Sequence, residues 1–411
     1  MPLAVKAFIA PLIVACAMFM ESVDANVIVT AIPEMARAFG RDPVTLKVAV
    51  TSYVLGLGVF IPICGWVADR FGARTVFRTA IGIFVVGSLL CAASTSLGPF
   101  TVARFIQGVG GAMMVPVGRI IIFRSVRRSE FIRAMLGPAV GPLLGGFITT
   151  YLHWRLIFFI NVPIGIFGIY LTNRYIANSR EEHLGPLDWF GFFLSAGAGV
   201  LLLLGLSLVG GELVSERTAY AMVAAGALMV ALYVLHARRA LRPLLDLRFF
   251  RVPTFQASVL GGSMFRIGLG AVPFLLPLAL QEGLGLSAFK SGAITCASAF
   301  GGMFMRSFAS RVLRRFEFRQ TLYYNAALSG IAIAACGTFF PGTPMWVIWS
   351  VVLLGGFFPA LQFTSLNSLA YAEIETRDVG RATSLASFVQ QVSLGLGVTV
   401  AGITLQVTRS I

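Results

Sequence analysis

The chain has 411 residues, of which 57% are hydrophobic and only 12% are charged. Soluble proteins carry about 25% charged residues, so this composition and a mean hydropathy of +0.86 exclude a soluble enzyme or binding module. They predict an all-α protein that crosses the membrane many times.

Hydrophobic stretches long enough to cross a bilayer as helices occur about thirteen times along the chain. The expected spans are 7–32, 47–68, 77–95, 99–121, 134–152, 157–176, 189–210, 218–237, 254–280, 290–308, 321–340, 345–367 and 382–407. We expect an N-terminal six-helix bundle (1–176), a two-helix insert with its flanking cytoplasmic loops (177–253) and a C-terminal bundle (254–411). Five helices are visible in that last bundle, and a sixth is expected to be missing.

The loops between these spans divide the cations unequally. If Lys6 is cytoplasmic, that side carries 23 of the 32 Lys and Arg residues and the opposite side carries seven. In this count Arg104 and Arg266 are the cations assigned to spans, while Arg119 and Arg306, near the cytoplasmic ends of the spans 99–121 and 290–308, are counted with the adjoining loops. The positive-inside rule then places the amino terminus in the cytoplasm and the protein in the plasma (inner) membrane. The net charge of +15 is therefore a signal of topology, and we expect no nucleic-acid partner.

Charges within two of the expected spans mark a candidate proton site. Glu21 and Asp24 stand three residues apart on one face of the first helix, and Arg104 stands in the fourth, where an unanswered guanidinium is costly. At ~1.5 Å rise per residue, Asp24 lies about 13 Å below Pro33. By the same measure Arg104 lies about 7 Å below Pro99, so the two share a layer of the membrane. We predict proton coupling at Asp24, Arg104 and Glu21. The alternative is a static buried ion pair, with Glu21 satisfied by a neighbouring helix.

Other polar residues interrupt otherwise apolar helices. Gln107, Arg266, Gln362 and Gln390 are candidates for the lining of a substrate cavity, although hydrogen bonding between helices explains them as well. The chain contains no HExxH, Walker A or GxSxG motif, and its three histidines fall in expected loops or at the edges of spans. We therefore expect no enzyme, no metal site and no cofactor.

Two similar basic loops indicate that the two halves of the chain arose by duplication. Residues 67–75 read VADRFGART and residues 312–320 read VLRRFEFRQ, and both keep Arg-Phe-x-x-Arg between two spans on the cytoplasmic side. A repeated loop in corresponding positions is typical of duplicated transporters. Two unrelated basic turns are the alternative.

The stretch 65–74, GWVADRFGAR, resembles the loop motif G-x-x-x-D-R-x-G-R-R of the major facilitator superfamily, with an alanine in place of one arginine. Gly65 allows close helix approach, Gly72 permits a tight turn, and Asp69 can sit at the positive amino-terminal end of a neighbouring helix. The resemblance implies a latch that holds the two bundles in one state. It involves Gly65, Asp69, Arg70, Gly72 and Arg74.

Three further stretches are similar to motifs of the same superfamily. Residues 104–112, RFIQGVGGA, resemble the fourth-helix motif R-x-x-Q-G-x-G-x-A, whose arginine is linked to proton transfer. Residues 23–33, VDANVIVTAIP, resemble the first-helix motif L-D-x-T-I-V-N-V-A-L-P of the fourteen-helix drug:proton antiporters (the QacA/EmrB-like group). Residues 137–146, GPAVGPLLGG, resemble the antiporter motif G-P-x-x-G-G, although a kinked packing helix explains them equally well. The residues of this third match are Gly137, Pro138, Gly141, Pro142, Gly145 and Gly146.

The resemblance implies a proton-driven exporter of small amphipathic compounds that works by alternating access between two bundles. The proton gradient would supply the energy, and the partners would be a small-molecule substrate, protons and the lipid bilayer. A periplasmic adaptor protein is an open alternative to a monomer. The short fifth span, 134–152, and the missing fourteenth helix leave two other functions open. One is a non-transporting relative, and the other is a proton symporter for an organic solute.

Overall fold

The computed structural model describes residues 9–18, 20–21, 24, 35, 38–41, 46–125, 154–178, 180, 185–209, 214–286 and 288–410. All regular secondary structure in these residues is helical. The expected span 134–152, and with it the whole stretch 137–146 that resembles the antiporter motif, lies outside the described residues.

The first group of helices, residues 9–239, contains a helix at Ile9–Met18 that precedes α2. Asp188 and Ser215 cap the amino-terminal turns of α10 and α11 with their side chains, which satisfies backbone donors that a helix leaves free. The elements are α2 (Lys47–Phe60), α3 (Cys64–Phe71), α4 (Ala73–Ala93), α5 (Leu97–Ser125), α8 (Leu156–Phe159), α9 (Asn161–Tyr175), α10 (Trp189–Leu208) and α11 (Glu216–Arg239).

The second group, residues 253–410, contains α13, which has two internal prolines and a π-helical segment at each end. Proline removes a backbone donor, and π segments absorb such irregularities. The elements are η3 (Leu247–Arg251, in the linker), α12 (Pro253–Gln256), η4 (Ala257–Gly261), α13 (Gly262–Leu278), η5 (Ala279–Gly283), α14 (Ala288–Arg315), α15 (Phe318–Ala335), η6 (Cys336–Thr338), α16 (Met345–Ala370), η7 (Thr376–Asp378) and α17 (Val379–Ser410).

Among the described residues, six helices are long and apolar enough to cross a membrane, and the bent pair α2 and α3 makes a seventh. We expected this pair to be one continuous span, 47–68. Instead the chain bends by 57° between Phe60 and Cys64, because Pro62 has no N–H and cannot continue the helical ladder. Helix α3 then runs on to Phe71, so most of the expected loop 65–74 is helical. The turn itself is Gly72 alone, with φ 90°.

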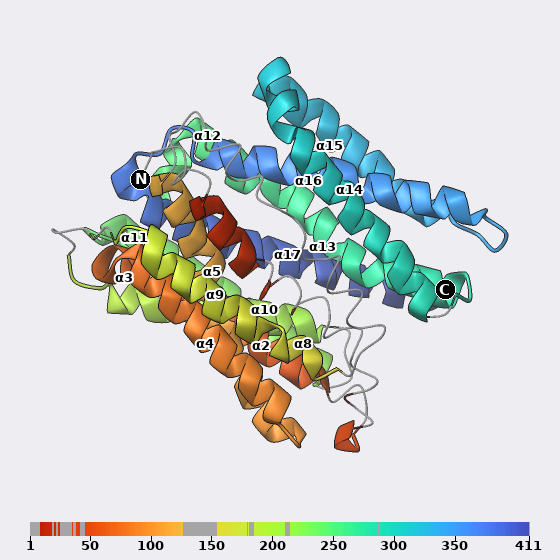
Figure 1. Ribbon diagram of the computed structural model, residues 1–411, viewed down its shortest axis with the longest axis horizontal. Coiled ribbons are helices and arrows are strands. Elements are labelled where there is room, and N and C mark those ends of the chain that lie inside the picture. Colours follow the sequence, from red (N-terminus) through yellow and green to blue (C-terminus); the bar gives the residue numbers. More distant parts are fainter. Residues whose placement is uncertain are drawn as a thin grey trace.

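Figure 1 shows the two helix groups side by side, with α17 running along their junction. Helix α17 contacts α3, α5 and α10 of the first group and α13 of the second. The largest buried hydrophobic cluster crosses this junction, since Ile61 and Ala68 of the first group share it with Ala382 and Leu385 of α17. A continuous apolar core thus joins the two groups where α3 meets the start of α17.

Candidate functional site

Asp24 and Arg104 form an ion pair in the first helix group. Arg104 Nη1 lies 2.5 Å from Asp24 Oδ2, and the two residues are 1% and 0% exposed. Arg104 lies on α5, which is one continuous helix from Leu97 to Ser125. Both charges are removed from water, so their mutual attraction and their hydrogen bonds must offset a large desolvation cost.

Gln107 completes the coordination of this pair. Its carbonyl oxygen accepts from Arg104 Nη1 at 2.5 Å, while its amide nitrogen donates to Asp24 Oδ1 at 2.8 Å. The same amide donates to Ser88 Oγ at 2.7 Å, which also accepts from Asn161 Nδ2 at 2.9 Å. The network therefore reaches from the first helix through α5 to α4 and α9.

Tyr53 connects the ion pair to Glu21. The Arg104 guanidinium carbon lies 4.6 Å from the centre of the Tyr53 ring, a cation–π distance. The Tyr53 hydroxyl donates to Glu21 Oε1 at 3.4 Å. Helices α2 and α5 approach closely enough for these contacts because Gly108 faces the Tyr53 carbonyl, where a Cβ would not fit. The three residues predicted for proton coupling are thus brought together by one tyrosine.

The Arg104 guanidinium has partners besides Asp24. The Gln107 carbonyl accepts from its Nη1, and the Tyr53 ring lies within cation–π distance. A buried charge with several such partners costs less than one that has none. The network therefore stabilises the buried Arg104 charge through more than one contact.

Another buried arginine is one that the charge count placed with a loop. Arg119 is 4% exposed and sits inside α5, as the expected span 99–121 implies, so counting it with the cytoplasmic loop was wrong. Its Nη2 donates to Gln390 Oε1 of α17 at 3.3 Å, across the junction of the two helix groups. Arg306 likewise lies within a helix, α14, and inside the expected span 290–308, although the charge count placed it with a loop. Both helices extend past the expected spans, α5 to Ser125 and α14 to Arg315.

The segment 65–74 contacts the start of α17. The Gly65 backbone N–H donates to Ser384 Oγ at 2.8 Å, and a Cβ at Gly65 would collide with the Gly380 carbonyl. Asp69, 2% exposed, pairs with Arg124 of α5 at 2.6 Å, and its carboxylate lies against Gly380 in the first turn of α17. A carboxylate is favourable at that end of a helix.

The other residues of this segment lie outside that contact. Arg70 is exposed and Arg74 is half-buried. Gly72 turns against Asn178, whose side-chain carbonyl accepts from the Thr75 N–H at 3.2 Å. The positive φ of Gly72 favours glycine.

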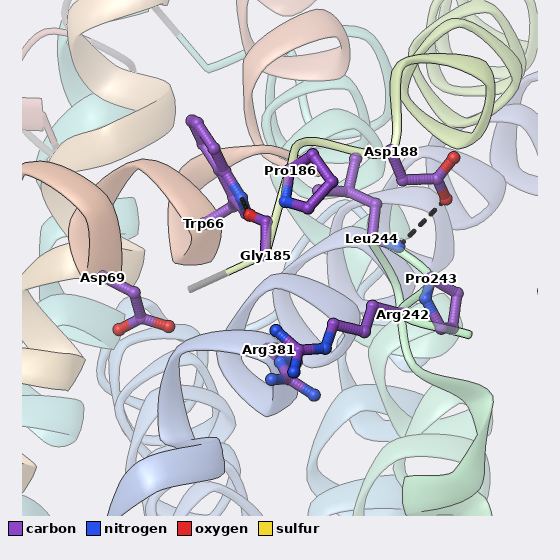
Figure 2. Close-up of a pocket in the computed structure, with 9 residues that line it drawn as sticks. All are labelled: Trp66, Asp69, Gly185, Pro186, Asp188, Arg242, Pro243, Leu244 and Arg381. Atoms are coloured by element: carbon purple, nitrogen blue, oxygen red, sulfur yellow. Dashed lines mark hydrogen bonds between the residues drawn. The ribbon is translucent and has the colours of Figure 1, made fainter. Parts of the chain in front are cut away.

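A small cavity lies beside Asp69, as Figure 2 shows. Its volume of about 30 Å³ is room for a water molecule or two and too small for a substrate. Asp188 accepts there from the Leu244 N–H at 3.3 Å. The lining residues are Trp66, Asp69, Gly185, Pro186, Asp188, Arg242, Pro243, Leu244 and Arg381.

The four residues proposed for a substrate cavity lie in four different surroundings. Gln107 belongs to the Asp24 network, and Gln390 contacts Arg119. Arg266 Nη1 donates to the main-chain carbonyls of Ser258 and Val259 at 3.1 and 3.3 Å. Gln362 accepts from Asn325 Nδ2 at 3.0 Å. The described residues therefore do not bring these four side chains together.

Sequence reasoning missed several members of the site. Ser88, Asn161 and Tyr53 are isolated polar groups in apolar helices, a signal that could have placed them on facing surfaces but not in one network. Gly380 and Ser384 stand at the start of the last span, and no motif marked them. In the described part of the chain, no group of three His, Cys, Asp or Glu side chains could hold a metal ion.

Solved structures share this fold. The chain matches the crystal structure of the human organic anion transporter MFSD10 (TETRAN) with a TM-score of 0.63 and 14% identity, over 98% of this chain and 94% of that one. It matches the proton:xylose symporter XylE with a TM-score of 0.64 and 14% identity, over 100% of this chain and 90% of that one. At this identity the likeness shows the fold alone.

Sequence relatives extend over nearly the whole chain. The "Putative multidrug resistance protein MdtD" of Salmonella heidelberg (strain SL476) is 37% identical over 403 residues, which cover 96% of this chain and 85% of the relative. The protein of the same description in Escherichia coli (strain K12 / DH10B) is 37% identical over 402 residues, with the same coverage of both chains. The family model of the Major Facilitator Superfamily matches residues 14–398. The chain is therefore a multi-pass membrane transporter and not an enzyme, and it belongs to the major facilitator superfamily.

Proposed function

We propose that this transporter exports small amphipathic compounds in exchange for protons, by alternating access between two helix bundles. The observation that carries the proposal is the buried network of Asp24, Arg104 and Gln107. Buried ionisable groups in transporters mark proton or ion pathways. The description of its relatives as multidrug resistance proteins supports the class of compound.

The proposed architecture has the three parts that the sequence analysis predicts. Residues 1–176 and 254–411 form the two bundles, and 177–253 form an insert, as in fourteen-helix antiporters. The unequal cation distribution supports a cytoplasmic amino terminus in the plasma (inner) membrane. The stretch 137–146 supports antiport by its resemblance alone.

In the proposed cycle, the 65–74 segment holds the cytoplasmic ends together while Asp24 exchanges its proton with the outside. The contacts of Gly65 and Asp69 with the start of α17 support this role. Opening toward the cytoplasm would then break these contacts. Asp24 would release its proton there as a compound binds.

Everted membrane vesicles test the proposal. With an inside-acid pH gradient reported by a quenched dye, we would add ethidium (a lipophilic cation), anilinonaphthalene sulfonate (an anion) and phenylnaphthylamine (its neutral analogue). At least one should collapse the gradient in wild type and none in Asp24→Asn. The exposed acid Glu216 supplies the matched control, and Glu216→Gln should behave as wild type.

The Asp24→Asn protein must be shown to be folded, since breaking a buried ion pair is destabilising. Gel filtration and proton-independent exchange of the transported dye provide that check. Gradient-driven transport that persists in a folded Asp24→Asn protein would exclude Asp24 as the proton carrier.

A further inference from the structure

Two buried arginines at the junction of the helix groups form no ion pair with a carboxylate among the described residues. Arg119 and Arg266 are 4% and 3% exposed. Arg119 donates to the neutral Gln390, and Arg266 donates to main-chain carbonyls. The Nε of each guanidinium is buried without a hydrogen-bond partner in the described part of the protein. Such charges are expensive in a membrane, and they are kept where they have a function.

Arg119 lies between the proton network and the cytoplasmic contacts. It is fifteen residues beyond Arg104 on α5, or ~22 Å along the helix axis. It stands five residues before Arg124, which pairs with Asp69. Arg119 interacts electrostatically with Glu21 on the network side and with Cys64 on the other, and the Cys64 thiol touches Ser384 of α17.

Arg266 adds a second positive charge to this layer. It interacts electrostatically with Arg119 across the junction of the two groups. One helical turn beyond Arg119, the ring of Phe123 lies 6.1 Å from that of Tyr371, so aromatic packing continues the closure toward the cytoplasm. A proton leaving Glu21 or Asp24 along α5 would first meet the two guanidinium groups and then this packing.

We propose that Arg119, together with Arg266, forms an electrostatic barrier that prevents protons from leaking into the cytoplasm while the cytoplasmic ends are closed. The inference rests on the proposed proton coupling and adds a residue that prevents protons from crossing without a transported compound. A fixed positive charge in a narrow, poorly hydrated path excludes protons in water channels by the same physics. At an effective dielectric constant near 20, a guanidinium that lies roughly 8 Å from a passing proton repels it strongly enough to slow its passage on the order of tenfold or more.

Proton leak into proteoliposomes tests the barrier without any transported compound. Purified protein would be reconstituted with pyranine inside, valinomycin and potassium would clamp the potential, and an acid pulse would start the leak. Arg119→Gln, which keeps a donor for Gln390 but removes the charge, should raise the leak on the order of tenfold. Arg119→Lys and Gln390→Leu, which keep the charge, should stay within about twofold of wild type.

Controls separate charge from structure. Arg311→Gln removes an exposed arginine of α14 and should not change the leak, while Arg266→Gln should raise it less than Arg119→Gln does. A wild-type leak in folded Arg119→Gln would overturn the barrier. An equal leak in Gln390→Leu would also overturn it, because the hydrogen bond, not the charge, would then be the seal.

The double variant Arg119→Gln/Asp24→Asn distinguishes this inference from the proposed function. If the added leak runs through Asp24, it should fall back toward the wild-type rate. If the double variant leaks as fast as Arg119→Gln, the barrier stands but Asp24 is not on the proton path. If Asp24→Asn abolishes gradient-driven transport in vesicles while Arg119→Gln does not leak, the barrier alone is wrong.

Discussion

Arg104 in the first helix group faces a carboxylate, whereas Arg266 in the second faces main-chain carbonyls. Around Arg104 the described partners include Asp24, Gln107 and the Tyr53 ring. Around Arg266 lie the π-helical turn of η4 and the ring of Phe363, at 5.9 Å. The first arrangement places a carboxylate beside the buried guanidinium, and the second, among the described residues, does not.

The two helix groups also differ in their other buried polar side chains. Among the side chains that the structure describes, the buried carboxylates of the spans lie in the first group. The polar side chains buried in α13 to α17 are hydroxyls, amides and the Arg266 guanidinium. We propose that the first group carries the proton, because the second has no buried carboxylate among its described residues that could do so. Four variants test that division.

The largest effect should follow Arg104→Gln. It leaves the Asp24 carboxylate buried without its counter-charge, which costs about 3–5 kcal/mol when a buried pair is broken. The double variant Arg104→Gln/Asp24→Asn should recover much of that loss, because no charge then remains. Denaturant unfolding of the purified proteins in detergent measures both. Equal stability of the single and double variants would mean that the pair is not energetically coupled.

Gly65→Ala should affect transport strongly and the proton site little. Its Cβ would collide with the Gly380 carbonyl, and backbone cannot move aside as a flexible side chain can. Closure toward the cytoplasm should become unfavourable, and dye transport should fall at least about tenfold. Gly82→Ala is the matched control, since a Cβ there meets nothing within 4 Å. Equal transport by the two variants would show that the helices need not approach this closely.

Arg266→Gln should cost less stability than Arg104→Gln and leave transport dependent on the pH gradient, apart from the small added proton leak expected above. Its loss removes a donor from the Ser258 carbonyl, worth about 1–3 kcal/mol if that carbonyl stays unsatisfied, while the Val259 carbonyl still accepts from Ser263 Oγ at 2.7 Å. Unfolding measurements and the vesicle assay should therefore separate, with lower stability but a retained dependence on the pH gradient. Loss of gradient-driven transport with normal stability would place proton coupling in the second group as well.

The smallest effect concerns Asp246, in the linker before α12. Burial raises the pKa of this carboxyl, but hydrogen bonds and charge from Arg248, with help from Arg381, outweigh it and hold the pKa below its ordinary value. A depressed pKa contributes stability that is present at neutral pH and is lost as pH falls through the folded-state pKa. Because Arg248 is largely exposed, solvent screening should keep this below about 1 kcal/mol.

Asp246→Asn should therefore flatten the acid limb of stability against pH without changing stability by much at neutral pH. Thermal unfolding from neutral to acidic buffer measures it. An unchanged acid limb would mean that Asp246 does not titrate in this range.

Much of this could be read from the sequence, for physical reasons. Apolar runs must form helices in a bilayer, so the described spans fall close to the expected ranges. The meeting of Asp24 and Arg104 was predicted from the cost of an unpaired charge and from their position in the same layer of the membrane. The break at Pro62 was missed because the apolar run continues through it.

Contacts between residues distant in the sequence could not be predicted. Nothing near Gly65 indicates that Gly380 lies against it, because that contact depends on how the two groups pack. Arg119 was counted with a loop because it is a cation near the end of the expected span 99–121, although α5 continues to Ser125 and keeps its side chain buried. The position of a cation in the sequence does not show whether a neighbouring helix buries its side chain.

Proton release on ligand binding tests the central claim most directly. The dye that collapses the gradient in vesicles would be added to purified protein in weak buffer, between about pH 5 and about pH 9, with a pH indicator present. We predict release of protons from wild type and from Arg266→Gln, and none from folded Asp24→Asn that still binds the dye. Undiminished release from Asp24→Asn would contradict the claim that the first helix group carries the transported proton on this carboxylate.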